Sequence, residues 1–190
     1  MIRKPAFNNP SFEKGKQTML CNLKPKKEEE LLDEETGEDA GNVVWAVALT
    51  NFVMLDVDDR SFNFVSDFAD QYDKYHKLGS YQIEMSSKGV GQTDFEGNVQ
   101  NNYFIIFGKY IHSFETVRWH VDEAKRLNVV SHDFSYLRKF GSITLRTGAK
   151  NKETHAPVTV KLVRNGSMEG IRHYLMHKKV TEGLGFLGDE

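Results

Sequence analysis

Cysteine and proline are scarce in this chain of 190 residues, which holds one cysteine, Cys21, and four prolines. A single thiol excludes a disulfide framework within the chain and a zinc site built from its cysteines, and it favours a reducing compartment. No stretch approaches the ~20 consecutive apolar residues of a membrane-spanning helix, and the N-terminal residues show no apolar core of a secretory signal. We therefore expect a soluble, cytoplasmic protein that has no membrane partner.

An excess of charge of one sign is also missing. The net charge of −2 gives no general attraction to nucleic acid, so a site for a polyanion must be a local patch. Residues 1–42 hold three of the four prolines, a basic run and then an acidic run. This composition predicts a mobile or loosely docked tail before a single α+β domain of catalytic type over residues 43–180, with a C-terminal tail over 181–190.

Hydrophobic periodicity predicts strands and helices in the order β-β-α-β-β-α-β-β-β-α. The strands are expected over 43–49, 52–58, 81–85, 103–108, 129–133, 142–146 and 158–163. Each helix is expected to begin after a capping serine: Ser61, Ser113 or Ser167. The short link Thr50–Asn51 predicts an antiparallel hairpin between the first two strands. The order predicts an α+β fold with one mixed or antiparallel sheet and helices mainly on one face, an RRM-like or split βαβ core.

Two aspartates follow the second apolar strand. Because side chains alternate along a strand, Asp56 and Asp58 are expected on the same face, with their Cα atoms about 6.6–7 Å apart. Two such carboxylates can hold one hard cation or bridge two, and Mg²⁺ prefers carboxylates together with phosphate oxygens and water. Asp133, after the β-branched pair at 129–130, is the best candidate for a third carboxylate. The alternative is that these acids end a strand, cap a helix and stay hydrated.

Two further segments carry groups that can bind phosphate. The glycine-rich segment "SSKGVG" offers backbone N–H groups and the side chains of Ser87 and Lys88 around Gly89, although a flexible hairpin loop has the same composition. Residues 138–152 contain five cations and no acid: Arg138, Lys139, Arg146, Lys150 and Lys152. Such a patch suits a triphosphate or a nucleic-acid backbone, and a charged strand edge that discourages aggregation is the other interpretation.

Taken in order along residues 43–163, these motifs resemble those of the archaeo-eukaryotic primase, or primase–polymerase, superfamily. The first motif of that family is an apolar strand ending in D-x-D, as in "VMLDVDD". The second is a Ser/Gly loop that leads into a strand, as in "EMSSKGVG" before "NNYFIIFG", and the third is an aspartate followed by an arginine and a basic strand, as in "VVSHDFSYLRKFGSITLR". The family has a histidine at the entry to the second motif's strand, where this chain has Asn101, Asn102 and Tyr103.

The resemblance implies a metal-dependent, template-directed nucleotidyltransferase of the DNA primase or polymerase type, acting in replication or repair. Two Mg²⁺ or Mn²⁺ ions would be held by Asp56, Asp58 and Asp133. A nucleoside triphosphate would be held by Ser87, Lys88, Gly89, Arg138 and Arg146, and a DNA or RNA template by Lys139, Lys150 and Lys152. A larger replication protein is a further expected partner. Three alternatives stay open: a non-catalytic nucleic-acid-binding module on the same fold, a nuclease using the same acids, and an interaction protein with a structural acidic cluster.

Overall fold

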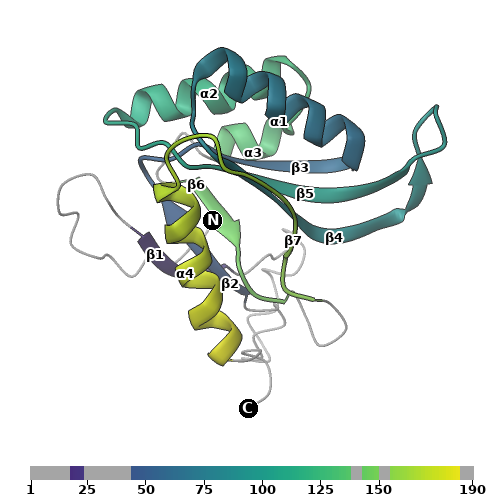
Figure 1. Ribbon diagram of the computed structural model, residues 1–190. Helices are drawn as coiled ribbons and strands as arrows, with labels where there is room; N and C mark the ends of the chain where they lie inside the picture. The colour runs from purple at the N-terminus through teal and green to yellow at the C-terminus, as the bar shows by residue number, and fades with distance from the viewer. Residues whose placement is uncertain (1–17, 24–43, 138–142, 150–154, 185–190) are drawn as a thin grey trace.

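Two antiparallel sheets form the frame of the protein in the computed structural model, which describes residues 18–23, 44–137, 143–149 and 155–184 (Figure 1). The four-stranded sheet has the order β3 (Met54–Ser61), β5 (Val99–Phe107), β4 (Tyr81–Thr93) and β7 (Val158–Val163). The three-stranded sheet has the order β1 (Thr18–Leu23), β2 (Val44–Leu49) and β6 (Ile143–Arg146). The predicted α+β class with antiparallel pairing is confirmed.

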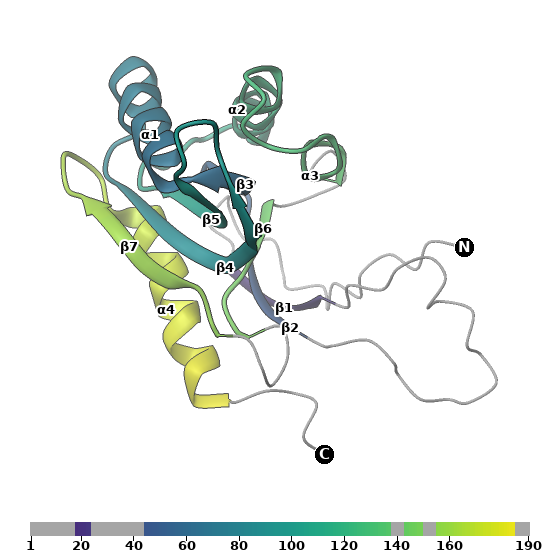
Figure 2. The same ribbon diagram turned by 90° about the vertical axis from the view of Figure 1, so that its right-hand side faces the viewer.

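Helices cover the four-stranded sheet unequally on its two sides. The helices are α1 (Phe62–His76), α2 (Phe114–Arg126), α3 (His132–Leu137) and α4 (Glu169–Leu184). The first three lie on one side of this sheet, and α4 and the three-stranded sheet lie on the other (Figures 1 and 2). Within the described residues, no helix is long and apolar enough to span a bilayer.

The central strand β5 is buried on both faces. Its residues from Tyr103 to Phe107 are all buried, which agrees with their continuous apolar character. Strands covered on both faces are apolar at every position rather than at every second one. The arrangement of α1 and α2 on one side and α4 on the other therefore explains why "YFIIF" shows no alternation.

The capping serines predicted for the first two helices are confirmed. Ser61 Oγ accepts from the backbone N–H of Phe64 at 3.4 Å, and Ser113 Oγ accepts from that of Thr116 at 3.3 Å. Each hydroxyl satisfies one of the four N–H groups that have no partner in the first helical turn. Helix α1 ends at His76, where Lys77 adopts a left-handed conformation with φ of 55°.

The predicted hairpin at Thr50–Asn51 is wrong. Strand β2 pairs with β1 and β6, whereas β3 pairs with β5, so the chain passes from one sheet to the other at this link. Asn51 fixes the crossing, because its backbone carbonyl accepts from the N–H of Ile111 at 2.8 Å and its Nδ2 donates to the carbonyl of Ile111 at 2.7 Å. The expected single sheet is therefore two sheets.

The strand predicted over residues 129–133 is also wrong. Val129 and Val130 are buried without joining a sheet, and the chain enters α3 directly afterwards. Ser131 Oγ accepts from the N–H of Phe134 at 3.1 Å, which caps this short helix. Burial of a β-branched pair in an irregular segment gives the same local sequence signal as a short strand.

The first and last elements lie partly within the segments predicted as tails. Strand β1 falls inside residues 1–42 and pairs with β2 along its whole length, from Thr18 opposite Leu49 to Leu23 opposite Val44. Helix α4 continues to Leu184, past residue 180. The remaining residues of both predicted tails lie outside the part of the chain that the structure describes.

His120 makes the stability of the fold depend on pH. Burial, assisted by the nearby His76, lowers the pKa of this side chain to about 4, and Glu123 opposes the shift. The unfolded state therefore binds more protons between pH 6.5 and pH 4, so the free energy of unfolding should fall by about 2 kcal/mol as pH drops through that window. Urea denaturation across the window should show this slope, and His120→Gln should reduce it.

A matched control for the pH dependence is His155→Gln, because His155 is exposed. Its slope should equal that of the parent protein. An unchanged slope in His120→Gln would assign the pH dependence to other groups, among them His76 and His177, whose pKa values are also lowered by burial.

Glu84 and Lys178 form an ion pair between the sheet and α4. Glu84 is fully buried, and its Oε2 accepts from Lys178 Nζ at 2.6 Å. Lys178→Met should lower the free energy of unfolding by about 3 kcal/mol, because it leaves a buried carboxylate without its counter-charge. Lys179→Met removes an exposed lysine from the same helix and should change stability by less than about 0.5 kcal/mol. Equal denaturation midpoints for the two variants would contradict this expectation.

Candidate functional site

Strand pairing brings the first two predicted motifs side by side. In the order β3-β5-β4, Asp56 lies opposite Phe104, and Phe104 lies opposite Glu84. One step further along, Asn102 lies between Asp58 and Asp59 of β3 and Ser87 of β4. Motifs separated by about thirty residues in sequence thus lie side by side on β3, β5 and β4. We call this part of the sheet the rim and define it as Asp56, Asp58, Asn102, Ser87 and Lys88.

A β-bulge shapes the end of β3. Val57 pairs with Tyr103 and Arg60 pairs with Asn101, so Asp58 and Asp59 together oppose one residue of β5. Asp59 has a φ of 52°, in the left-handed region that aspartate tolerates better than most residues. The bulge carries Asp58 and Asp59 into solvent, whereas Asp56 is half-buried.

Asn102 connects the bulge to β4. Its Oδ1 accepts from the backbone N–H of Asp59 at 2.9 Å, and its Nδ2 donates to Ser87 Oγ at 2.9 Å. One amide side chain therefore holds the rim of the D-x-D strand at a fixed distance from the Ser/Gly segment. Sequence reasoning named Asn102 only as a residue standing in the place of a histidine, and its position at the entry of an apolar strand was the available signal.

The segment "SSKGVG" is part of strand β4, so the expected loop is wrong. Gly89 packs so closely against β5 that a Cβ atom would lie 2.2 Å from the carbonyl oxygen of Gln100. Its N–H donates to Asn101 Oδ1 at 3.0 Å and does not face open solvent as a phosphate-binding amide would. Lys88 is exposed and lies opposite Asn101, so its ammonium group extends from the strand into solvent.

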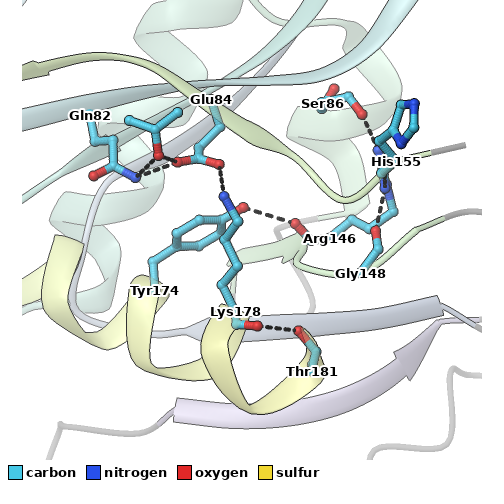
Figure 3. Close-up of polar contacts among 10 residues, drawn as sticks. Gln82, Glu84, Ser86, Arg146, Gly148, His155, Tyr174, Lys178 and Thr181 are labelled. Carbon is cyan, nitrogen blue, oxygen red and sulfur yellow. Dashed lines mark hydrogen bonds and ion pairs between the residues drawn. The ribbon is translucent and has the colours of Figure 1, made fainter. Parts of the chain in front are cut away.

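On the α4 side of the sheet, polar groups are buried together (Figure 3). Glu84 bonds to Lys178 and also accepts hydrogen bonds from Gln82 and Thr159. Tyr174 of α4 donates to the backbone carbonyl of Arg146 at 3.1 Å, and burial raises its pKa well above the ordinary value. Sequence reasoning missed this group, although alternation of Gln82 and Glu84 in "YQIEM" places two polar side chains on one face of a strand.

Arg146 is held inside the protein by backbone carbonyls. Its side chain is buried and donates to the carbonyl of His155 at 3.2 Å and to the carbonyls of Ser86 and Gly148. Burial lowers the pKa of the guanidinium, and the charge of Asp56 nearby acts in the opposite direction. Arginine nevertheless stays protonated in proteins, so a buried cation lies near Asp56. Its hydrogen bond to the Ser86 carbonyl holds β4 at the register shift between Met85 and Ser87.

Asp133 lies in another layer of the molecule. It is exposed in the first turn of α3, and α3 contacts α2, with a hydrogen bond from Ser135 Oγ to Asp122 Oδ1 at 2.7 Å. No three His, Cys, Asp or Glu side chains of the described residues form a group that could hold a metal ion, and Asp56, Asp58 and Asp133 are among those residues. The three predicted acids are therefore not gathered into one centre.

The rim still fits a different metal-binding arrangement. Two carboxylates, Asp56 and Asp58, lie on a strand beside the neutral oxygens of Asn102 and Ser87. Mg²⁺ is commonly held by one or two carboxylates while water and substrate phosphates complete its shell. These donors suit one hard cation that arrives with a nucleotide better than a preformed site with two ions.

The remaining predicted cations fall outside the described residues. These are Arg138, Lys139, Lys150 and Lys152, which were assigned to the nucleotide and the template.

Comparisons of the chain with protein-family models, with curated protein sequences and with solved structures found no significant match. The assignment of function therefore depends on the residues of the rim.

Arg146→Lys distinguishes a structural cation from a phosphate ligand. Lysine keeps the charge but loses the planar fork of donors, so the buried carbonyls of Ser86 and Gly148 lose partners and the protein should be destabilised by about 2 kcal/mol. Urea denaturation and amide hydrogen exchange at Ser86–Lys88 would measure this loss. Arg164→Lys, at an exposed position, is the control and should change neither the free energy of unfolding nor the amide exchange rates at Ser86–Lys88. Full stability of Arg146→Lys would show that the carbonyl contacts contribute little.

Proposed function

We propose that the rim of the four-stranded sheet binds a nucleoside triphosphate with Mg²⁺ or Mn²⁺, and that the protein is a primase–polymerase-like nucleotidyltransferase on an RRM-like core. The observation that supports this most is the bridge through Asn102, which joins the D-x-D strand to the Ser/Gly strand. Two sequence motifs that were each weak alone are adjacent in space, as a shared ligand requires.

Each residue of the rim has a distinct role in the proposal. Asp56 and Asp58 provide the negative charge for the cation, and Ser87 binds the phosphates that the cation neutralises. Lys88, the next residue of β4, points to the other face of the sheet and contributes only its charge. A divalent cation in such a site lines up the attacking hydroxyl and stabilises charge on the leaving pyrophosphate. Arg146 does not contact the phosphates in this proposal. Its hydrogen bond to the Ser86 carbonyl orients the start of the phosphate-binding segment of β4.

The experiment for this proposal measures nucleotide binding and primer extension together. The double variant Asp56→Asn, Asp58→Asn should weaken Mn²⁺-dependent binding of a fluorescent deoxynucleoside triphosphate by at least about tenfold, because the carboxylates are replaced by neutral isosteres. Extension of a primed template with Mn²⁺ and triphosphates should be lost in the same variant. Asp59→Asn is the matched control, because asparagine also tolerates a positive φ and Asp59 is exposed.

Two results would contradict the proposal. If the affinity of the parent protein for the nucleotide were the same with and without Mn²⁺, the proposed cation site would be wrong. Degradation of the primed template without extension, lost in the double variant, would favour a nuclease that uses the same two acids.

A second candidate function is a nucleic-acid-binding module without catalysis. The separation of Asp133 from the other acids favours it, as do two exposed aromatic side chains, Phe62 and Phe64, beside the end of β3. The guanidinium of Arg60 lies 5.5 Å from the ring centroid of Phe64, a pairing that can also stack on bases. Single-stranded oligonucleotide binding that needs no divalent ion, survives in the double Asp variant and falls in Phe64→Ser would support this second function.

A further inference from the structure

An acidic, apolar arm projects from the four-stranded sheet. We define the arm as residues 89–100, which begin beside the end of β3, where Gln100 pairs with Ser61, and continue past it (Figure 1). It contains two acids, Asp94 and Glu96, and no Lys, Arg or His. Its apolar side chains are directed into solvent: Phe95 is 97% exposed, Val90 84% and Val99 57%. A fully exposed aromatic side chain at the tip of a projecting hairpin is characteristic of a contact surface.

The tip of the arm has a defined shape. Asp94 Oδ1 accepts from the N–H groups of Glu96 and Asn98 at 3.0 and 2.9 Å, and the backbone N–H of Asp94 donates to the carbonyl of Asn98 at 2.9 Å. Desolvation alone would raise the pKa of Asp94, but the hydrogen bonds from Asn98, Ser61 and Glu96 together lower it, so this carboxylate stays charged. The turn therefore presents Phe95 between two acidic residues. Because the turn is already ordered, a contact made through Phe95 would lose little conformational entropy.

The outer face of α4 has the complementary chemistry. Met176 and Val180 are one turn apart and are 53% and 48% exposed. Arg172 and Lys179 are exposed on the same face, at helical spacings of four and three residues from Met176. This outer face, defined by these four residues, is an apolar strip bordered by two cations.

The arm and the outer face of α4 cannot meet within one molecule. In Figure 1 the arm leaves the sheet at the right of the view, whereas α4 lies below the sheet and runs downward, away from the arm. We propose that the arm of one copy docks on the outer face of α4 of a second copy. Phe95 packs on Met176 and Val180, while Asp94 and Glu96 approach Arg172 and Lys179.

Charge selects a second copy over nucleic acid as the occupant of the arm. Two acids next to Phe95 repel a phosphate backbone, whereas the same acids match the cations beside the apolar strip of α4. The contact is heterologous, because different surfaces of the two copies meet, and such contacts generate rings or extended chains of subunits. This inference does not depend on the proposed nucleotide site, which lies on the rim of the sheet.

Sedimentation velocity across a concentration series tests the proposal. The parent protein should self-associate over about 10 μM to about 1 mM, and Phe95→Ser should weaken that association by more than about tenfold. Met176→Ser should weaken it similarly. Tyr75→Ser, which removes another exposed aromatic (83% exposed) from a third surface, is the matched control and should have no effect.

Mixing the variants tests the heterologous geometry itself. Phe95→Ser keeps an intact α4 face and Met176→Ser keeps an intact arm, so an equimolar mixture should regain association that neither variant shows alone. A mixture that stays monomeric would overturn the arm-to-helix contact, as would a parent protein that remains monomeric at the highest concentration. Association that does not weaken when salt rises from low concentration to about 1 M would overturn the role of the charges.

Discussion

Burial of charge between the four-stranded sheet and α4 is the constraint on which the arrangement of this protein depends. Glu84 is fully buried with Lys178, and Arg146 is buried beside Asp56. Ionised groups are costly to remove from water unless each has its partner in place, so arrangements of β4, β6 and α4 that separate these partners are disfavoured. The observed arrangement also orients the bulged residue Ser86 and, through it, the rim where the two motifs meet.

Much of the fold follows from local sequence patterns. Helices α1 and α2, their serine caps and the strands around "YFIIF" were predictable because periodicity and capping are local properties. The division into two sheets was not, because it is set by pairing between distant segments, and the link between the sheets is itself bonded to a distant residue, Asn51 to Ile111. Strand β1 was not predicted for a related reason. Its residues lie in a segment of low apolar content, and it is a strand because it pairs with β2, which is distant in the sequence.

The candidate site was predictable only in part. The D-x-D strand and the Ser/Gly segment could be identified from spacing, and strand pairing places them together. The third carboxylate could not be placed, because the β-branched pair before Asp133 gives the same signal for a short strand as for a buried turn before a helix. Buried partners also decide the role of a cation. Arg146 was expected to face a ligand, whereas its two terminal nitrogens donate to the backbone carbonyls of Ser86, Gly148 and His155.

The pairing of β1 with β2 has a consequence for protein engineering. Leu23 and Val44 are register partners, so the connection between them starts and ends at neighbouring points of one sheet, whatever its length. The entropy of closing such a connection grows only with the logarithm of its length, by roughly 0.6 kcal/mol per doubling. A reporter domain inserted there would therefore have both of its attachment points at neighbouring positions of one sheet.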